Sequence, residues 1–85
     1  MRYRAVVSVM PKPGISDPEG KAIKDASNQL GHEGVLKVAS GRVYVLETES
    51  RDIASATELA NRLAGELLSN PIIQSYELTR VEEIQ

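Results

Sequence analysis

The sequence has no cysteine and only one histidine among its 85 residues. Without cysteine the chain can form no disulfide, no thiolate nucleophile and no thiolate metal site. A metal site would therefore need oxygen ligands, and no loop spaces its carboxylates as a calcium-binding loop does. We expect this chain to hold no metal ion and no cofactor.

Aromatic side chains are also scarce, because three tyrosines are present but no phenylalanine or tryptophan. Proteins that bind single-stranded nucleic acid stack bases on aromatic rings and present basic surfaces to the phosphates. Here the net charge is -2 and the two signs are interspersed along the chain. We therefore expect no nucleic-acid partner.

Long apolar runs are missing as well. The start Met-Arg-Tyr-Arg-Ala lacks the apolar stretch of a signal peptide, and no segment is long enough to cross a bilayer. We expect a cytoplasmic protein without membrane contact, folded as a single domain over residues 1–85. A chain of this length buries only about 60–65% of its unfolded surface, so self-association would help to stabilise it.

The most specific stretch present is residues 13–23, Pro-Gly-Ile-Ser-Asp-Pro-Glu-Gly-Lys-Ala-Ile, where a strand pattern gives way to a helix pattern. Asp17 followed by Pro18 is typical of a helix N-cap and first helical position, which predicts a helix that begins at Pro18. Gly20 costs up to about 1 kcal/mol relative to alanine inside a helix. We therefore expect its missing side chain to admit the close approach of another surface, such as a partner protein.

Periodicity predicts the elements on either side of this turn. Residues 3–10 are rich in valine and form the first strand, at a central position in the sheet. Pro11 and Pro13 end it because proline cannot donate to the ladder. The helix that begins at Pro18 ends at Gly31, which has the residue type expected just after a helix C-terminus.

Two more strands are predicted over residues 35–39 and 43–48, joined as a hairpin through Ser-Gly-Arg at residues 40–42. A second helix with a broad leucine stripe follows and stops at Asn70-Pro71. Its start is open, because Ser55 has capping-box spacing with Glu58 whereas Ser50 or Asp52 would cap it a turn earlier.

The last alternating segment, residues 75–81, predicts a fourth strand, followed by a frayed tail. The order strand, helix, strand, strand, helix, strand favours an α+β fold, βαββαβ. In it, one antiparallel sheet has both helices on one face, as in a ferredoxin-like sandwich. The aliphatic residues of the hairpin exceed what two helices can cover. We therefore expect a homodimer or tetramer formed through the sheet.

The residue types present do not combine into a recognisable set of catalytic residues. His32 is the only imidazole and follows a helix C-terminus, where a loop role is the simpler interpretation. The Gly-Lys pair at residues 20–21 lacks the spacing of a phosphate-binding loop, and Asp17 and Glu19 would repel an anion there. We expect no catalytic and no nucleotide-binding residue in this chain.

Two stretches resemble the small PurS subunit family of bacterial and archaeal phosphoribosylformylglycinamidine (FGAM) synthase. Residues 13–23 are similar to that family's K-P-G-V-L-D-P-Q-G-K-A, and residues 67–76 are similar to its L-L-A-N-P-V-I-E-D-Y. With length and element order, the resemblance spans essentially the whole chain. It departs at Glu19, where glutamine is common, at His32, where an aromatic is usual, and at residues 40–42, where a Gly-Lys turn is common.

The resemblance implies a subunit of an ATP-dependent carbon–nitrogen ligase of de novo purine (IMP) biosynthesis, with glutamine as the amido donor. In that complex the glutaminase PurQ releases ammonia. The large synthetase PurL uses ATP and Mg to convert formylglycinamide ribonucleotide (FGAR) to its amidine. The small subunit, without catalytic residues, would bridge the two and assist ammonia transfer. Its expected partner interface here comprises Pro13, Gly14, Asp17, Pro18, Gly20 and Lys21.

An alternative interpretation is a stand-alone ferredoxin-like dimer that binds a small-molecule effector between its subunits. Such a protein would need a ligand pocket with convergent polar groups, and the sequence indicates none. A free-standing enzyme is disfavoured because the chain lacks a catalytic set.

Overall fold

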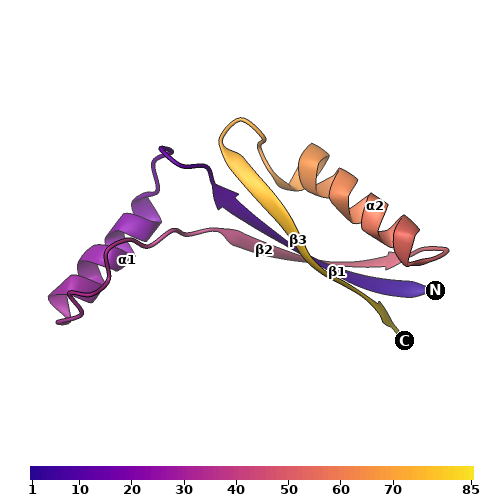
Figure 1. Cartoon of the computed structure of the whole chain (residues 1–85), viewed down its shortest axis with the longest axis horizontal. Helices are drawn as coiled ribbons and strands as arrows, with labels where there is room; N and C mark the ends of the chain where they lie inside the picture. Colours follow the sequence, from indigo (N-terminus) through magenta and orange to yellow (C-terminus); the bar gives the residue numbers. More distant parts are fainter.

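Three strands and three helical segments make up the computed structural model, which describes all of residues 1–85 (Figure 1). In chain order they are β1 (Arg2–Pro11), α1 (Pro18–Gln29), β2 (Arg42–Glu49), α2 (Ile53–Leu63), the π-helical turn η1 (Ala64–Leu68) and β3 (Gln74–Ile84). The fold is therefore α+β. None of the helices has the length and apolar character needed to cross a membrane.

The sheet is antiparallel with the order β2-β1-β3, so β1 is central, as its valine-rich sequence predicts. Alternate residues of β1 are buried beneath α2, which covers one face of the sheet (Figure 1). Alanines at every fourth position of α2 and η1 let the helix approach this face closely. These contacts form a small core whose fully or nearly buried residues are Tyr3, Ala5, Val7, Val9, Ala56, Ala60 and Ala64.

Both helix starts follow from their capping residues. α1 begins at Pro18 after Asp17, as predicted. α2 begins at Ile53, and the carboxylate of Asp52 accepts a hydrogen bond of 2.8 Å from the Ser55 backbone N–H. Asp52 is thus the cap, rather than Ser55 or Ser50.

The predicted strand over residues 35–39 is wrong, and so is the hairpin through residues 40–42, because residues 35–41 have no regular secondary structure. Their alternation suits a strand, but a strand needs a neighbour to bond. The pairing of β1 with β2 reaches only to Val9 opposite Arg42, so residues 35–41 lie beyond the sheet. The sheet therefore has three strands instead of four.

The prediction that both helices cover one sheet face is also wrong. α1 lies beyond the end of the sheet, and the segment that follows it runs back along the helix before it enters β2 (Figure 1). Gly20 is its only buried residue, whereas Ile23 is 45% and Leu30 is 78% exposed. The single chain is accordingly long and flat, with extents of 50 × 29 × 14 Å, and not a closed ferredoxin-like sandwich.

The tail is more ordered than the sequence indicates. β3 runs to Ile84, and its last residue pairs with Arg2 of β1. A shift of register between Val6 and Val7 interrupts the ladder, and the Thr79 hydroxyl donates to the Val6 carbonyl there over 3.1 Å. Such an irregularity increases local twist and redirects the strand.

Candidate functional site

The predicted interface residues lie where α1 meets the end of the sheet, a region we call the α1 junction (residues 11–21 and 36–42). Its first part is the loop from β1 to α1, in which Gly14 has a φ of 86°. That left-handed conformation suits glycine and lets the loop turn toward α1. The Lys12 N–H donates to the Ile73 carbonyl over 2.9 Å, which joins this loop to the turn before β3. The two family-like stretches are therefore neighbours in space.

Asp17 is the centre of the α1 junction. Its carboxylate accepts hydrogen bonds from the Gly20 N–H at 2.9 Å, from the Ser40 N–H at 2.7 Å and from the Ser40 hydroxyl at 2.6 Å. The first caps α1, as the sequence predicts. The other two cross to the segment before β2. Together they hold the pKa of Asp17 below its usual value, with the Ser40 hydroxyl as the main cause.

Ser40 is the residue of the α1 junction that cannot be identified from the sequence, although it makes two hydrogen bonds to Asp17. The sequence predicts Ser40 in the turn of a hairpin that does not form, and its separation from Asp17 along the chain hides the contact. A serine next to the flexible Gly41 is the only signal in the sequence, and it is equally typical of any turn.

Gly20 does admit the close approach of another surface, but that surface belongs to the same chain. A Cβ atom at this position would collide with the Val38 carbonyl oxygen and lie 2.6 Å from an Asp17 carboxylate oxygen. The missing side chain therefore serves packing within the α1 junction. Contact of Gly20 with a partner protein stays a prediction.

Three hollows surround Asp17, and each predicted interface residue lines at least one of them. The largest two have volumes of about 310 and 330 Å³. Pro18 lines one of these together with Asp17, and Gly20 and Lys21 line the other. Pro13 and Gly14 line the third, of about 120 Å³. The structure thus brings the predicted residues together around Asp17.

Catalytic groups are not assembled at the α1 junction. His32 is exposed beyond α1, where its backbone N–H donates to the Ser27 carbonyl at 3.0 Å. No group of three or more His, Asp or Glu side chains is placed to hold a metal ion. Among the charged side chains at the junction, Asp17 caps α1 and the Lys12 ammonium group donates to the Pro71 carbonyl.

The sheet face away from α2 is a second candidate surface, which we call the open face. Val43 and Val45 of β2 are 64% and 58% exposed on it, next to Val6 of β1. The guanidinium of Arg4 lies at its border, 3.9 Å from Glu47 and 3.8 Å from Glu82. An apolar centre with a charged border is typical of protein interfaces.

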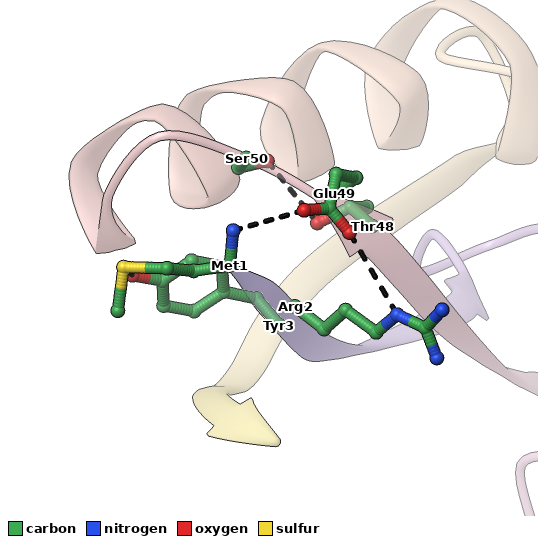
Figure 2. Close-up of polar contacts among 6 residues, drawn as sticks. All are labelled: Met1, Arg2, Tyr3, Thr48, Glu49 and Ser50. Atoms are coloured by element: carbon green, nitrogen blue, oxygen red, sulfur yellow. Dashed lines mark hydrogen bonds and ion pairs between the residues drawn. The ribbon is translucent and has the colours of Figure 1, made fainter. Parts of the chain in front are cut away.

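The other end of the sheet is held by polar contacts (Figure 2). The N-terminal ammonium group lies 2.9 Å from the Glu49 carboxylate, and the Arg2 guanidinium approaches the same group at 3.7 Å. The hydrogen bond from the ammonium group lowers the pKa of Glu49. These contacts are exposed and add little to the backbone ladder that pairs β1 with β2.

Comparison with known proteins gives a consistent result. Residues 4–82 match the family model PurS, described as phosphoribosylformylglycinamidine (FGAM) synthase. The PurS subunit of this synthase from Mycobacterium leprae is 42% identical over 77 residues, which cover 91% of this chain and 94% of the relative. The corresponding subunit from Methanocaldococcus jannaschii is 32% identical, with 98% and 99% covered.

Solved structures agree with the sequence comparisons. Thermus thermophilus PurS superposes with a TM-score of 0.90 and 33% identity, and the match covers 100% of both chains. A chain of PurLQS from Thermotoga maritima superposes with a TM-score of 0.83 and 26% identity over 99% of each chain. Since these matches include α1, its placement beyond the sheet is part of the shared arrangement.

Proposed function

Because the chain belongs to the PurS family and is a subunit of FGAM synthase in purine biosynthesis, we propose that it is the non-catalytic bridge of that enzyme. Its partners are the glutaminase PurQ and the synthetase PurL. In this role it holds the two together and assists ammonia transfer for the conversion of FGAR to FGAM. The observation that carries the proposal is the match of the whole chain to one chain of PurLQS from Thermotoga maritima. Because the chain belongs to this family, we do not retain the alternative of a stand-alone dimer that binds a small-molecule effector.

The division of labour follows from residue types. With no catalytic set in this chain, glutamine hydrolysis belongs to PurQ, and the use of ATP and Mg belongs to PurL. We place the assembled enzyme in the cytoplasm and treat residues 1–85 as one PurS-like domain. The α1 junction, from Pro13 to Lys21, is our candidate surface for contact with the larger subunits.

We further propose that this subunit is a homodimer, or a pair of dimers, formed through the sheet. Two observations support a second copy as the occupant. The open face exposes Val43 and Val45 inside a border of both charge signs, which a copy of the same surface can complement. Residues 35–39 have a strand pattern but no strand neighbour within the chain, and a second chain can supply one.

A reconstitution tests the bridging function. PurL and PurQ are assayed for FGAM formation with and without this subunit, first with glutamine and then with a high concentration of ammonium salt. We expect omission to abolish synthesis from glutamine but not from ammonia, because ammonia released into bulk water is diluted and largely protonated. Loss with both nitrogen sources would place the subunit in the synthetase chemistry itself. No loss with either would overturn the proposal.

A further inference from the structure

The position of α1 raises the question of what fixes its direction. The helix lies beyond the sheet, its apolar side chains Ile23 and Leu30 are exposed, and it has no packed contact comparable to that of α2 with β1. Two connections join it to the rest of the chain, the loop from β1 and residues 30–41. Packing against the sheet therefore cannot be what orients α1.

One side-chain link joins these two connections. The Asp17 carboxylate stands at the end of the first, and it accepts from both the N–H and the hydroxyl of Ser40 in the second, at 2.7 and 2.6 Å. Hydrogen bonds to an ionised carboxylate are stronger than those between neutral groups. The close contact of Gly20 with the Val38 carbonyl seats the first turn of α1 beside the same segment.

The other helix cap shows that this link exceeds what a helix start requires. Asp52 caps α2 through a single backbone N–H, that of Ser55 at 2.8 Å, and reaches no distant segment. Asp17 makes the equivalent bond to the Gly20 N–H and then two more to Ser40. The bonds to Ser40 are therefore additional to capping, and their geometric effect is to tie α1 to the irregular segment that leads into β2.

We propose that Asp17 and Ser40 are positioning residues that set the direction of α1 relative to the sheet, and that this direction is required for the subunit to assemble with PurL and PurQ. The inference rests on the proposed bridging function. A bridging subunit must hold its contact surfaces at fixed relative positions. The hydrogen bonds between Asp17 and Ser40 fix the direction of α1 relative to the sheet. Neither residue takes part in chemistry.

Three variants separate the link from helix capping. Ser40→Ala removes the hydroxyl bond to Asp17 but leaves the cap at Gly20 intact. Ser40→Thr keeps a hydroxyl and is the conservative rescue. Ser27→Ala is the matched control, because the Ser27 hydroxyl donates to the Ile23 carbonyl at 2.9 Å within α1 and takes no part in the link.

The direction of α1 can be measured in the isolated subunit. Since the chain has no cysteine, Asp25→Cys on α1 and Glu58→Cys on α2 provide two exposed positions for spin labels. Pulsed electron paramagnetic resonance then gives their distance distribution, with excess unlabelled protein added so that only labels on one chain are paired. We expect a narrow distribution in the parent, Ser40→Thr and Ser27→Ala, and a broadened distribution in Ser40→Ala.

The assembled enzyme gives the second measurement. We expect Ser40→Ala to weaken assembly and glutamine-dependent synthesis by about tenfold, with ammonia-dependent synthesis unchanged and with Ser40→Thr restoring most of the loss. An unchanged distance distribution in Ser40→Ala would overturn the orienting role, whatever the activity. A broadened distribution with full glutamine-dependent synthesis would overturn its importance for assembly. If the bridging function itself is wrong, the reconstitution shows it independently of these variants, because glutamine-dependent synthesis is then complete when the whole subunit is omitted.

Discussion

Asp17 and Gly20 are three residues apart in sequence, and the role of each depends on the other. Gly20 supplies the backbone N–H that the Asp17 carboxylate caps, and its lack of a side chain leaves room for that carboxylate and for the Val38 carbonyl. The Asp-Pro-x-Gly pattern is thus a local packing solution. Its glycine would be required even if no partner protein touched this region.

This arrangement predicts that Gly20→Ala destabilises the isolated subunit. The new methyl group would overlap the Val38 carbonyl oxygen, so the α1 junction must shift, at a cost of about 2 kcal/mol. Gly34→Ala is the matched control, because a Cβ atom there meets nothing within 4 Å and its φ is not positive. Urea unfolding measures both variants. Equal stability of the two would contradict the packing role of Gly20.

The capping carboxylates also predict how stability depends on pH. The pKa values of Asp17 and Asp52 are both lowered from a usual value of 3.8, mainly by hydrogen bonds from Ser40 and Ser55 respectively. Between the lowered folded pKa and the unfolded value, the unfolded chain binds more protons. Stability is therefore fully present above about pH 4 and falls as the pH drops through the folded values.

Thermal melting between pH 7 and pH 2.5 tests this dependence. We expect a constant Tm down to about pH 4 and a decline below it. Ser40→Ala should make the decline shallower, because it removes the main cause of the lowered pKa of Asp17. A decline as steep as in the parent would mean that Asp17 does not contribute to acid stability through Ser40.

The alanines of the two helices differ in burial. Ala56, Ala60 and Ala64 lie four residues apart and are buried against the sheet, whereas Ala22 of α1 is exposed. We predict that Ala60→Leu destabilises the isolated subunit by about 1–3 kcal/mol, because a larger side chain pushes α2 away from β1. Ala22→Leu should leave its stability almost unchanged. Denaturant melts of the two variants, compared at the same concentration, check this difference.

Some secondary-structure elements could be predicted from the sequence and others could not. The start of α1 at Pro18 and the central position of β1 could be predicted, because both depend on residues within the element or next to it. Residues 35–39 could not, because whether an alternating segment becomes a strand depends on a neighbour, and β1 bonds nothing beyond Arg42 on that side. For the same reason the contact between Asp17 and Ser40 was invisible, although Asp17 itself was found.

For the whole molecule, the decisive property is that only eight of 85 residues are buried. A core of this size is small for an independent chain, and it leaves one sheet face and one helix exposed. We therefore predict that light scattering at micromolar concentration finds a dimer or tetramer. Val43→Glu combined with Val45→Glu should shift the protein to monomers, because like charges on the open face repel each other. Val45→Thr keeps the side-chain shape without charge and should remain associated.

A monomeric parent protein would contradict the proposal that the subunit associates with itself. Retention of the dimer in the double glutamate variant would instead show that the open face is not the surface used. Circular dichroism on each variant separates a loss of association from a loss of folding.

The central place of β1 has a consequence for how the chain acquires its structure. Its first residues pair with the last residues of β3, Arg2 with Ile84, so the pairing that completes the sheet spans almost the whole sequence. Closing so long a loop makes folding slow relative to chains with local contacts. On the ribosome, β1 must remain without one of its two neighbours until residues 74–84 have been synthesised, while the backbone N–H and C=O groups of that edge stay open to other chains.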